Sequence, residues 1–239
     1  MALPWLDDSD INFPAIESAL DEPNGLLAAG GDLSSKRLIQ AYRLGIFPWY
    51  ENEQPILWWS PDPRMVLLPE QLKITGSLRK FIRKQSYEIS MDRDFPQVID
   101  ACSGSRSNSG GTWITTELKQ AYCQLHVMGM AHSVEVWQQD ELVGGLYGIA
   151  IGELFFGESM FSRKDNTSKL ALVFLARQLQ KWNYPLIDCQ VSSQHLESLG
   201  AKEISRKMFK QYLNEYQDKP GKSGKWQPSL TQQQLVDEL

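Results

Sequence analysis

The sequence predicts an α+β fold in which helices pack on a mainly antiparallel sheet. Residues 132–162 hold three runs of about five to eight strand-forming residues, separated by the short turns QQDE and AIGE, which is typical of an antiparallel meander. Segments with helical periodicity lie on both sides of this meander. No Gly-rich phosphate-binding motif follows a strand, so a doubly wound nucleotide-binding fold is a poor fit.

We expect a small N-terminal domain over residues 1–62. EPNGLLAAGGDLS (22–34) predicts a turn-rich loop, after which Asp32 or Ser34 caps a short amphipathic helix that ends at Gly45. Prolines then recur through residues 48–63 and exclude regular helix from this stretch. We place the domain boundary near residues 61–64.

The larger domain is expected over residues 63–239. Before the meander, helices are predicted over 76–85, 95–104 and 115–129, with a strand near 87–91 and a flexible loop over 103–113. After it come a helix over 165–182, the strand LIDCQV (186–191), a short helix over 192–200, and a strand and helix over 201–216. The polar tail after about residue 218 is expected to be loose.

Composition narrows the class of protein. The net charge of −5 excludes a global field that attracts nucleic acid, so RNA binding requires a local basic patch. The cysteines are odd in number and form no CxxC pair, and the histidines are scattered, so we expect no disulfide, no metal site and no cofactor. Residues 1–10 do not form a signal peptide, and the longest apolar run, 170–176, is too short to span a bilayer; we expect a cytoplasmic monomer.

The strand LIDCQV contains the first candidate site. Alternation places Leu186, Asp188 and Gln190 on one face and the apolar residues on the other. In the functional interpretation, Asp188 holds Gln190 by a hydrogen bond and orients its amide. A surface strand with polar residues facing water is the alternative.

The strand GELFFGESMF contains the second candidate site. Phe156, Glu158 and Met160 share one face if this strand is regular, and a carboxylate between apolar side chains needs a partner or a ligand. An edge strand where Glu158 meets water is the alternative. The Gly144–Gly145 pair and Gly157 predict a bulge or a close approach of a ligand to the backbone.

A basic helix face and loop aromatics are the third and fourth candidates. Arg79, Lys80, Arg83 and Lys84 form two i,i+4 pairs of like charge, which either bind a polyanion or form a solvated face. Trp49, Trp58, Trp59 and Trp113 lie in or beside Gly- and Pro-rich loops, where tryptophans either pack or stack on bases. His195 is a further candidate, and His126 and His132 are interpreted as structural.

The chain resembles the leucyl/phenylalanyl-tRNA–protein transferase family over residues 13–216. Nine segments carry the resemblance, in this order: EPNGLLAAGGDLS, AYRLGIFPWY, ILWWSPDPR, GTWIT, HSVEVW, ELVGGLYG, LFFGESMFS, NTSKLAL and LIDCQV. The resemblance implies a small N-terminal domain followed by an acetyltransferase-like (GNAT-like) domain. It also implies transfer of Leu or Phe, and less often Met, from charged tRNA to acceptor proteins that begin with Arg or Lys, which directs them to N-degron proteolysis.

By position, the resemblance also implies roles for individual residues. It assigns catalysis to Asp188 and Gln190. It implies an amino-acid pocket lined by Glu158, Met160, Leu146 and Leu175. Contacts to the 3′ adenosine are implied for Trp49 and Trp113. Contacts to the tRNA acceptor stem are implied for Arg79, Lys80, Arg83 and Lys84. Leu146 and Leu175 stand where bulkier or more flexible apolar side chains are expected, which leaves the preference between Leu and Phe open.

The implied reaction needs no ATP, because the aminoacyl ester is already activated. An α-amine has a pKa of about 7.7–8.0 and is partly neutral at cellular pH. A neutral amide accepts protons poorly, so Gln190 is expected to orient the amine, while a ribose hydroxyl or a water takes the proton.

Two alternatives remain open at this point. A CoA-dependent N-acetyltransferase would share the fold, but FSRKDNTSKL has no glycine where its pyrophosphate loop is required. A non-catalytic RNA-binding module would use the same basic helix and aromatics.

Overall fold

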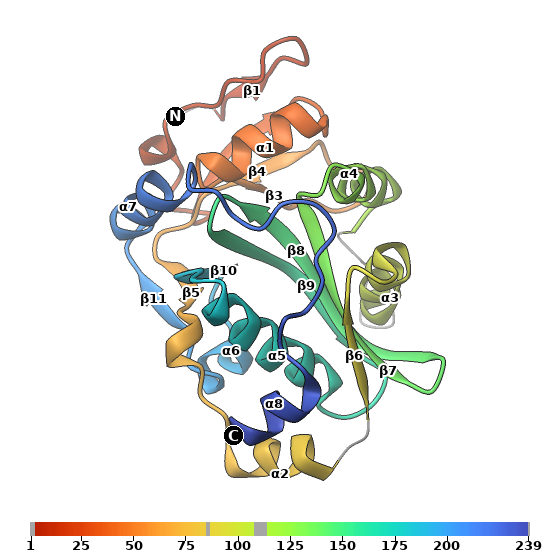
Figure 1. Ribbon diagram of the computed structural model, residues 1–239. Coiled ribbons are helices and arrows are strands. Elements are labelled where there is room, and N and C mark those ends of the chain that lie inside the picture. Colours follow the sequence, from red (N-terminus) through yellow and green to blue (C-terminus); the bar gives the residue numbers. More distant parts are fainter. Residues whose placement is uncertain (1–2, 85–86, 108–113, 239) are drawn as a thin grey trace.

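The computed structural model describes residues 3–84, 87–107 and 114–238, which form two sheets surrounded by helices (Figure 1). The small sheet has the order β1-β2-β4-β3, with β1 at Trp5–Leu6, β2 at Leu26–Gly30, β3 at Phe47–Pro48 and β4 at Leu57–Trp59. The expected turn-rich loop over 22–34 is thus wrong in its middle. Leu27 and Ala28 are buried there, and β2 pairs with β4, so pairing and burial outweigh the turn residues on either side.

The large sheet has the order β11-β5-β10-β9-β8-β7-β6, and only its β9–β10 pair is parallel. Its strands are β5 (Arg64–Leu67), β6 (Glu88–Met91), β7 (Ala131–Gln138), β8 (Glu141–Ile151), β9 (Leu154–Ser162), β10 (Leu186–Gln190) and β11 (Lys202–Ile204). The predicted α+β class with a mainly antiparallel sheet is confirmed, and the meander is β7–β8–β9.

Seven of the eight helices that the structure describes agree with the predicted segments to within a few residues, and the last one, over residues 232–237, was not predicted. The eight helices are α1 (Ser35–Arg43), α2 (Gly76–Lys84), α3 (Phe95–Ser107), α4 (Thr116–Val127), α5 (Thr167–Lys181), α6 (Gln194–Ser198), α7 (Arg206–Tyr216) and α8 (Gln232–Asp237). Ser34 caps α1 and Thr115 caps α4, each through a side-chain oxygen that accepts a backbone N–H. Short 3₁₀ turns lie at Ile16–Ser18 and Pro69–Gln71.

The two faces of the large sheet pack against different helices (Figure 1). One buried cluster joins Tyr147, Ile149 and Phe156 of the sheet to residues of α1, α3 and α4. The other joins Leu146 and Phe155 to α5. Helices on both faces make the sheet the central layer of the fold.

The meander contains two β-bulges at the glycines singled out in the sequence. The β7–β8 register skips Val143 beside Gly144, and the β8–β9 register skips Glu158 beside Gly157. An extra residue reverses the alternation of side chains beyond it. Phe156 and Met160 therefore lie on opposite faces, in the α4-side and α5-side clusters respectively. The expectation that they share a face with Glu158 is wrong because β9 is not regular.

The segment after Asp218 is not a loose tail as expected. It returns across the molecule and ends in α8 (Figure 1), with Trp226, Leu230 and Leu235 buried. The Trp226 ring stacks on His132 at 3.8 Å. These three buried residues lie in a polar stretch without sustained helical or strand periodicity, so the sequence pattern does not predict that the segment packs on the core.

The predicted domain boundary falls between β4, in the small sheet, and β5, in the large one. The division into two domains at this point remains a proposal. Among the described helices, none combines the length and the apolar character that a bilayer-spanning segment needs.

Candidate functional site

A cavity of about 450 Å³ lies where β9 and β10 diverge, beside α5. Strands β9 and β10 pair only as far as Asp188↔Phe156, so the later part of β9 has no neighbour on that side. The residues singled out in the sequence that line this cavity are Trp49, Leu146, Gly157, Glu158, Met160, Leu175, Gln190 and His195. Asp188 does not line it, and Trp113 lies outside the described residues.

Most of the cavity wall is apolar. Strands β8 and β9 contribute Leu146 and Met160, and the buried face of α5 contributes Leu172 and Leu175. A cavity of this size and lining suits one aliphatic or aromatic side chain together with the atoms attached to it. Glu158, Ser159 and Gln190 are polar groups in this wall, and each is nine-tenths buried.

Gln190 reaches the cavity because the end of β10 is irregular. Its φ is +64°, and the β10–β5 register shifts between Asp188 and Gln190. The expected alternation is therefore wrong here, since Gln190 lines the cavity together with Ile187 and Cys189. A non-glycine residue with positive φ is strained and needs local support. That support is the Gln190 backbone N–H, which donates to Asp188 Oδ1 at 3.0 Å.

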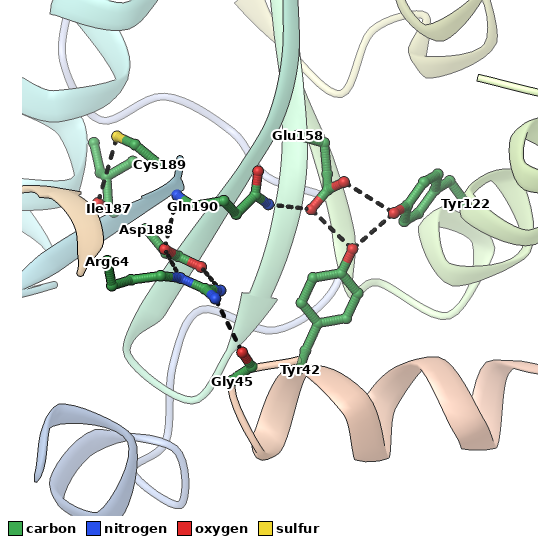
Figure 2. A network of polar contacts seen from close by, with 9 residues as sticks. All are labelled: Tyr42, Gly45, Arg64, Tyr122, Glu158, Ile187, Asp188, Cys189 and Gln190. Carbon is green, nitrogen blue, oxygen red and sulfur yellow. Dashed lines mark hydrogen bonds and ion pairs between the residues drawn. The ribbon is translucent and has the colours of Figure 1, made fainter. Parts of the chain in front are cut away.

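The hydrogen bond predicted between Asp188 and Gln190 thus exists, but it ends at the backbone and does not orient the side-chain amide. The amide Nε2 of Gln190 donates instead to Glu158 Oε1 at 2.9 Å. Figure 2 shows the carbonyl oxygen of this amide facing away from Glu158. Because Glu158 accepts from the amide nitrogen of Gln190, the amide carbonyl oxygen is the end that is left for a ligand in the cavity.

Asp188 is paired with Arg64 of β5 in a buried, two-pronged ion pair. Arg64 Nε and Nη2 donate to the two carboxylate oxygens at 2.8 and 2.7 Å, and Nη1 donates to the carbonyl of Gly45 (Figure 2). The guanidinium also lies 4.8 Å from the Phe47 ring centroid and 4.7 Å from that of Phe209. Two charges can be buried together when their geometry is bidentate and their remaining donors are satisfied.

Glu158 occupies the bulge of β9 and lies at the centre of a polar network. Tyr42 of α1 donates to Oε1 at 2.8 Å, and Tyr122 of α4 donates to Oε2 at 2.9 Å (Figure 2). The two tyrosine hydroxyls are themselves 2.7 Å apart. The alternative in which Glu158 meets bulk water is excluded, because its exposed fraction is 8%.

Burial raises the pKa of Glu158 to about 7, and the charge of Asp188 adds to the rise. Hydrogen bonds from Tyr42, Tyr122 and Gln190 act in the opposite direction. Burial also raises the pKa values of Tyr42 and Tyr122 well above that of an ordinary tyrosine, so both phenols stay neutral. Glu158 can therefore exchange a proton near neutral pH.

The remaining cavity residues differ in exposure. Trp49 is 42% exposed, and its backbone carbonyl accepts from Trp59 Nε1 at 2.6 Å. His195 is half-buried, and burial followed by the charge of Lys169 lowers its pKa. Burial raises the pKa of the Cys189 thiol, which makes it a poor nucleophile. Trp58 does not line the cavity; it is fully buried and donates to the Gly30 carbonyl, so it is a packing residue.

The predicted basic face forms on α2. Arg79, Lys80, Arg83 and Lys84 are all exposed, while Leu78 and Ile82 on the same helix are buried. None of the four lines the cavity, and Figure 1 shows α2 and α1 at opposite ends of the view. No ion pair among the described residues involves them, which leaves their charges available to an external anion.

Sequence reasoning missed three residues of the polar network: Tyr42, Arg64 and Tyr122. Tyr42 and Arg64 lie inside AYRLGIFPWY and ILWWSPDPR, two of the segments that carry the family resemblance, and their position there was the available signal. Tyr122 is one turn from Leu118 and Leu125 on the inner face of α4, where it is indistinguishable from a core aromatic. Within the described part of the chain, no three His, Cys, Asp or Glu residues gather as metal ligands.

Family models match most of the chain. The model for leucyl/phenylalanyl-tRNA protein transferase matches residues 66–214, and the model for the N-terminal domain of the same proteins matches residues 31–62.

Curated relatives match across almost their whole length. A leucyl/phenylalanyl-tRNA–protein transferase from Pseudomonas aeruginosa (strain PAO1) is 57% identical over 218 residues, covering 91% of this chain and 96% of that protein. One from Pseudomonas putida (strain W619) is 57% identical over 224 residues, covering 94% of this chain and 99% of the relative. One from Azotobacter vinelandii (strain DJ) is 57% identical over 218 residues, with 91% and 96% covered.

Similar solved structures are more distant. A conserved protein of unknown function from Staphylococcus epidermidis has a TM-score of 0.41 and 12% identity, covering 75% of this chain and 68% of its own. A GCN5-related N-acetyltransferase from Kribbella flavida has a TM-score of 0.38 and 10% identity, covering 73% and 62%. Similarity at this level supports no statement about activity.

Proposed function

This chain belongs to the leucyl/phenylalanyl-tRNA protein transferase family and is an aminoacyltransferase that acts on proteins; from that premise we propose that it moves Leu or Phe, and less often Met, from charged tRNA to an N-terminal Arg or Lys. The observation that carries this proposal is one cavity with apolar walls and an amide and a carboxyl at its polar end. The acceptor proteins would then enter N-degron proteolysis.

The apolar wall accounts for the proposed donors. Leu146, Met160 and Leu175 can surround an aliphatic or aromatic side chain and give no partner to a polar one. Such a pocket separates neighbours that differ by a methylene only about 10–200-fold. The proposal therefore includes graded use of Leu, Phe and Met, with no sharp choice among them.

Gln190 is proposed to orient the attacking amine through its side-chain carbonyl oxygen. Glu158 holds the other end of this amide, and Asp188 holds the backbone that places Gln190 in the cavity. Asp188 is thus proposed as a positioning residue, because its carboxylate is buried on Arg64 and does not line the cavity. Trp49, exposed at the cavity, is proposed to stack on the terminal adenosine.

The tRNA acceptor stem is proposed to lie on α2, whose four exposed cations are free of ion pairs among the described residues. We keep Trp113 as a second proposed contact to the adenosine, although it lies outside the described residues. The reaction as proposed needs no cofactor. It takes place in the cytoplasm, where charged tRNA is found, and is carried out by a monomer.

The test is incubation of radiolabelled Leu-tRNA or Phe-tRNA with a protein that begins with Lys or Arg. The expected result is label in the acceptor protein that disappears when its first residue is changed to Ala. Label that is independent of the first residue contradicts the proposed acceptor, and the absence of label with every donor contradicts the proposed reaction. Gln190→Ala should lower the single-turnover rate at saturating charged tRNA, whereas a near wild-type rate removes its role.

A further inference from the structure

Three oxygen-bearing groups at the polar end of the cavity form a closed ring of short contacts. Tyr42 Oη lies 2.8 Å from Glu158 Oε1, Tyr122 Oη lies 2.9 Å from Glu158 Oε2, and the two hydroxyls lie 2.7 Å apart. Figure 2 shows the three contacts meeting around the Glu158 carboxyl. Each distance is that of an O–H···O hydrogen bond, so each contact requires one hydrogen.

The ring is one hydrogen short if Glu158 is ionised. A neutral phenol carries a single O–H, so Tyr42 and Tyr122 supply two hydrogens to three contacts. Gln190 Nε2 cannot supply the third, because its hydrogen points at Oε1 and lies outside the ring. With a carboxylate, both hydroxyls donate to Glu158 and the two tyrosine oxygens face each other through lone pairs alone. A protonated carboxyl instead donates to one tyrosine, which then donates to the other, so all three contacts have a hydrogen.

A second buried glutamate in the same sheet provides a matched comparison. Glu135 of β7 is 0% exposed and accepts from the hydroxyls of Ser133 and Ser90 and from the backbone N–H of Asp94. Trp137 Nε1 donates to the Ser90 oxygen. Every contact here has its own hydrogen, so Glu135 is fully hydrogen-bonded as a carboxylate. The shortage of one hydrogen belongs to the Glu158 ring and does not follow from burial alone.

The groups that face Glu158 come from several elements. Tyr42 of α1 and Tyr122 of α4 contact Glu158 as phenols, and the phenol Tyr147 of β8 lines the same cavity. Asp188 of β10 is an anion whose charge is compensated by Arg64 of β5. Within the described residues that line the cavity, Glu158 is the only carboxyl, and His195 is the imidazole. Among the described residues no cation contacts the Glu158 oxygens, so a positively charged group that enters the cavity would stabilise the ionised form of Glu158.

We propose that Glu158 holds one exchangeable proton in the free protein, as the third hydrogen of the Tyr42–Tyr122–Glu158 ring, and carries the proton of the transfer reaction. The entering α-ammonium group favours the carboxylate form of Glu158, so the ring proton and the extra proton of the ammonium both pass to water before the attack. Glu158 is then the carboxylate that the reaction needs as an acceptor. This step rests on the proposed aminoacyl transfer.

Bonds and protons balance through Glu158, with water as the only other proton carrier. The neutral amine nitrogen attacks the ester carbonyl carbon, a C–N bond forms, and the nitrogen gives one proton to the Glu158 carboxylate. The ester C–O bond then breaks, and protonated Glu158 returns the proton to the leaving ribose oxygen. Glu158 is then ionised again and takes one proton from water when the products leave, which restores the ring, and neither nucleophile nor leaving group is released as an unpaired ion.

The first experiment measures the free protein by infrared spectroscopy. The wild type should show a protonated-carboxyl band at pH 6 that disappears as pH rises through about 7, where ordinary Asp and Glu, with pKa values near about 4, are fully ionised. The band should be missing in Glu158→Gln and present in the matched Glu135→Gln. The wild-type titration alone decides whether a proton is held above the ordinary range, so the result does not depend on the folding of either variant.

The second experiment measures single-turnover transfer at saturating charged tRNA as a function of pH. In the wild type, both the amine and Glu158 must lose a proton, so the logarithm of the rate should rise with a slope of about two on the acid side. Glu158→Gln should lower the rate by about 10²-fold or more and leave a slope of about one. Glu135→Gln should keep the steeper slope.

Two results overturn the inference. One is a wild type that transfers but has no carboxyl band above pH 6, or a band that Glu158→Gln leaves in place. The other is a Glu158→Gln rate within about twofold of wild type with an unchanged slope. A wild type that transfers from no donor overturns the proposed function and the proton-carrying step with it. The infrared titration needs no transfer, so it still shows in that case whether Glu158 holds the ring proton.

Discussion

Asp188 and Arg64 show how single residues support a cavity that they do not line. Their ion pair is buried, with exposed fractions of 0% and 1%, and it joins β10 to β5. Asp188 also accepts the backbone N–H that holds Gln190 at positive φ. Loss of either partner leaves an unpaired charge in the interior, which costs far more than the pair contributes.

We expect Asp188→Asn to destabilise the protein by about 3–5 kcal/mol, because Arg64 stays buried without its anion. Urea unfolding measures this change. Asp218→Asn is the matched control, since its ion pair with Arg43 is exposed, and a change below about 1 kcal/mol is expected. Equal effects of the two substitutions would contradict the structural role assigned to Asp188.

Glu158 predicts a pH dependence of stability at the same scale. Its pKa in the folded protein is about 7, above its ordinary value of 4.5 in an unfolded chain. The unfolded chain therefore ionises first, and the stability present below pH 4.5 is lost as pH rises through about 7. The wild type should lose about 3 kcal/mol over this range relative to Glu158→Gln. Parallel unfolding curves at pH 5 and pH 8 would contradict the raised pKa.

At the scale of elements, β9 forms part of the cavity, whereas α2 carries a basic surface. The bulge in β9 turns Glu158 toward Tyr42 and Tyr122 while Met160 stays on the α5 side of the sheet. One irregular strand thereby supplies both the polar end and part of the apolar wall of the cavity. Helix α2 uses Leu78 and Ile82 to pack and leaves its four cations exposed.

We expect Arg83→Glu on α2 to weaken tRNA binding by roughly tenfold and to reduce the salt dependence of binding by about one unit of logarithmic slope. The reason is the loss of one phosphate contact together with added repulsion. Fluorescence anisotropy with labelled tRNA at several salt concentrations measures both effects. Lys207→Glu on α7, which is also exposed, is the control with little effect. Equal losses from both variants would indicate only a general charge effect.

At the scale of the whole molecule, the C-terminal segment is part of the packed core. Trp226 stacks on His132 and its backbone N–H donates to Asp92, while Gln178 of α5 accepts from the N–H groups of Ser229 and Leu230. The segment thus connects the first strand of the meander with the helix that walls the cavity. Its removal should affect the whole fold.

We expect Trp226→Ala to destabilise the protein by about 3–5 kcal/mol, because it leaves a cavity where a buried indole packed. Urea unfolding with matched conditions measures the loss. Trp5→Ala is the control, since Trp5 is 72% exposed, and its effect should stay below about 1 kcal/mol. A small effect at Trp226 would mean that the segment only covers the sheet.

Much of the fold follows from local pattern. The meander, the helices from α1 to α7 and the strand β10 are present within a few residues of the predicted ranges, because periods of two and 3.6 residues and the caps at Ser34 and Thr115 are local signals. Nine ordered segments of the sequence also indicate the family. Strand alternation singles out Glu158, Met160 and Gln190, and the resemblance adds Leu146 and Leu175 to the residues that line the cavity.

The tertiary structure alone decided how these residues meet. Bulges at Glu158 and Gln190 reverse the expected faces, because register depends on the neighbouring strand and not on the strand itself. Asp188 finds Arg64, and Glu158 finds Tyr42 and Tyr122, at sequence separations that no periodicity spans. The sequence by itself determined the class, most of the elements and the family, whereas the partners of each buried polar group, and hence the ring of Tyr42, Tyr122 and Glu158, exist only once the chain has folded.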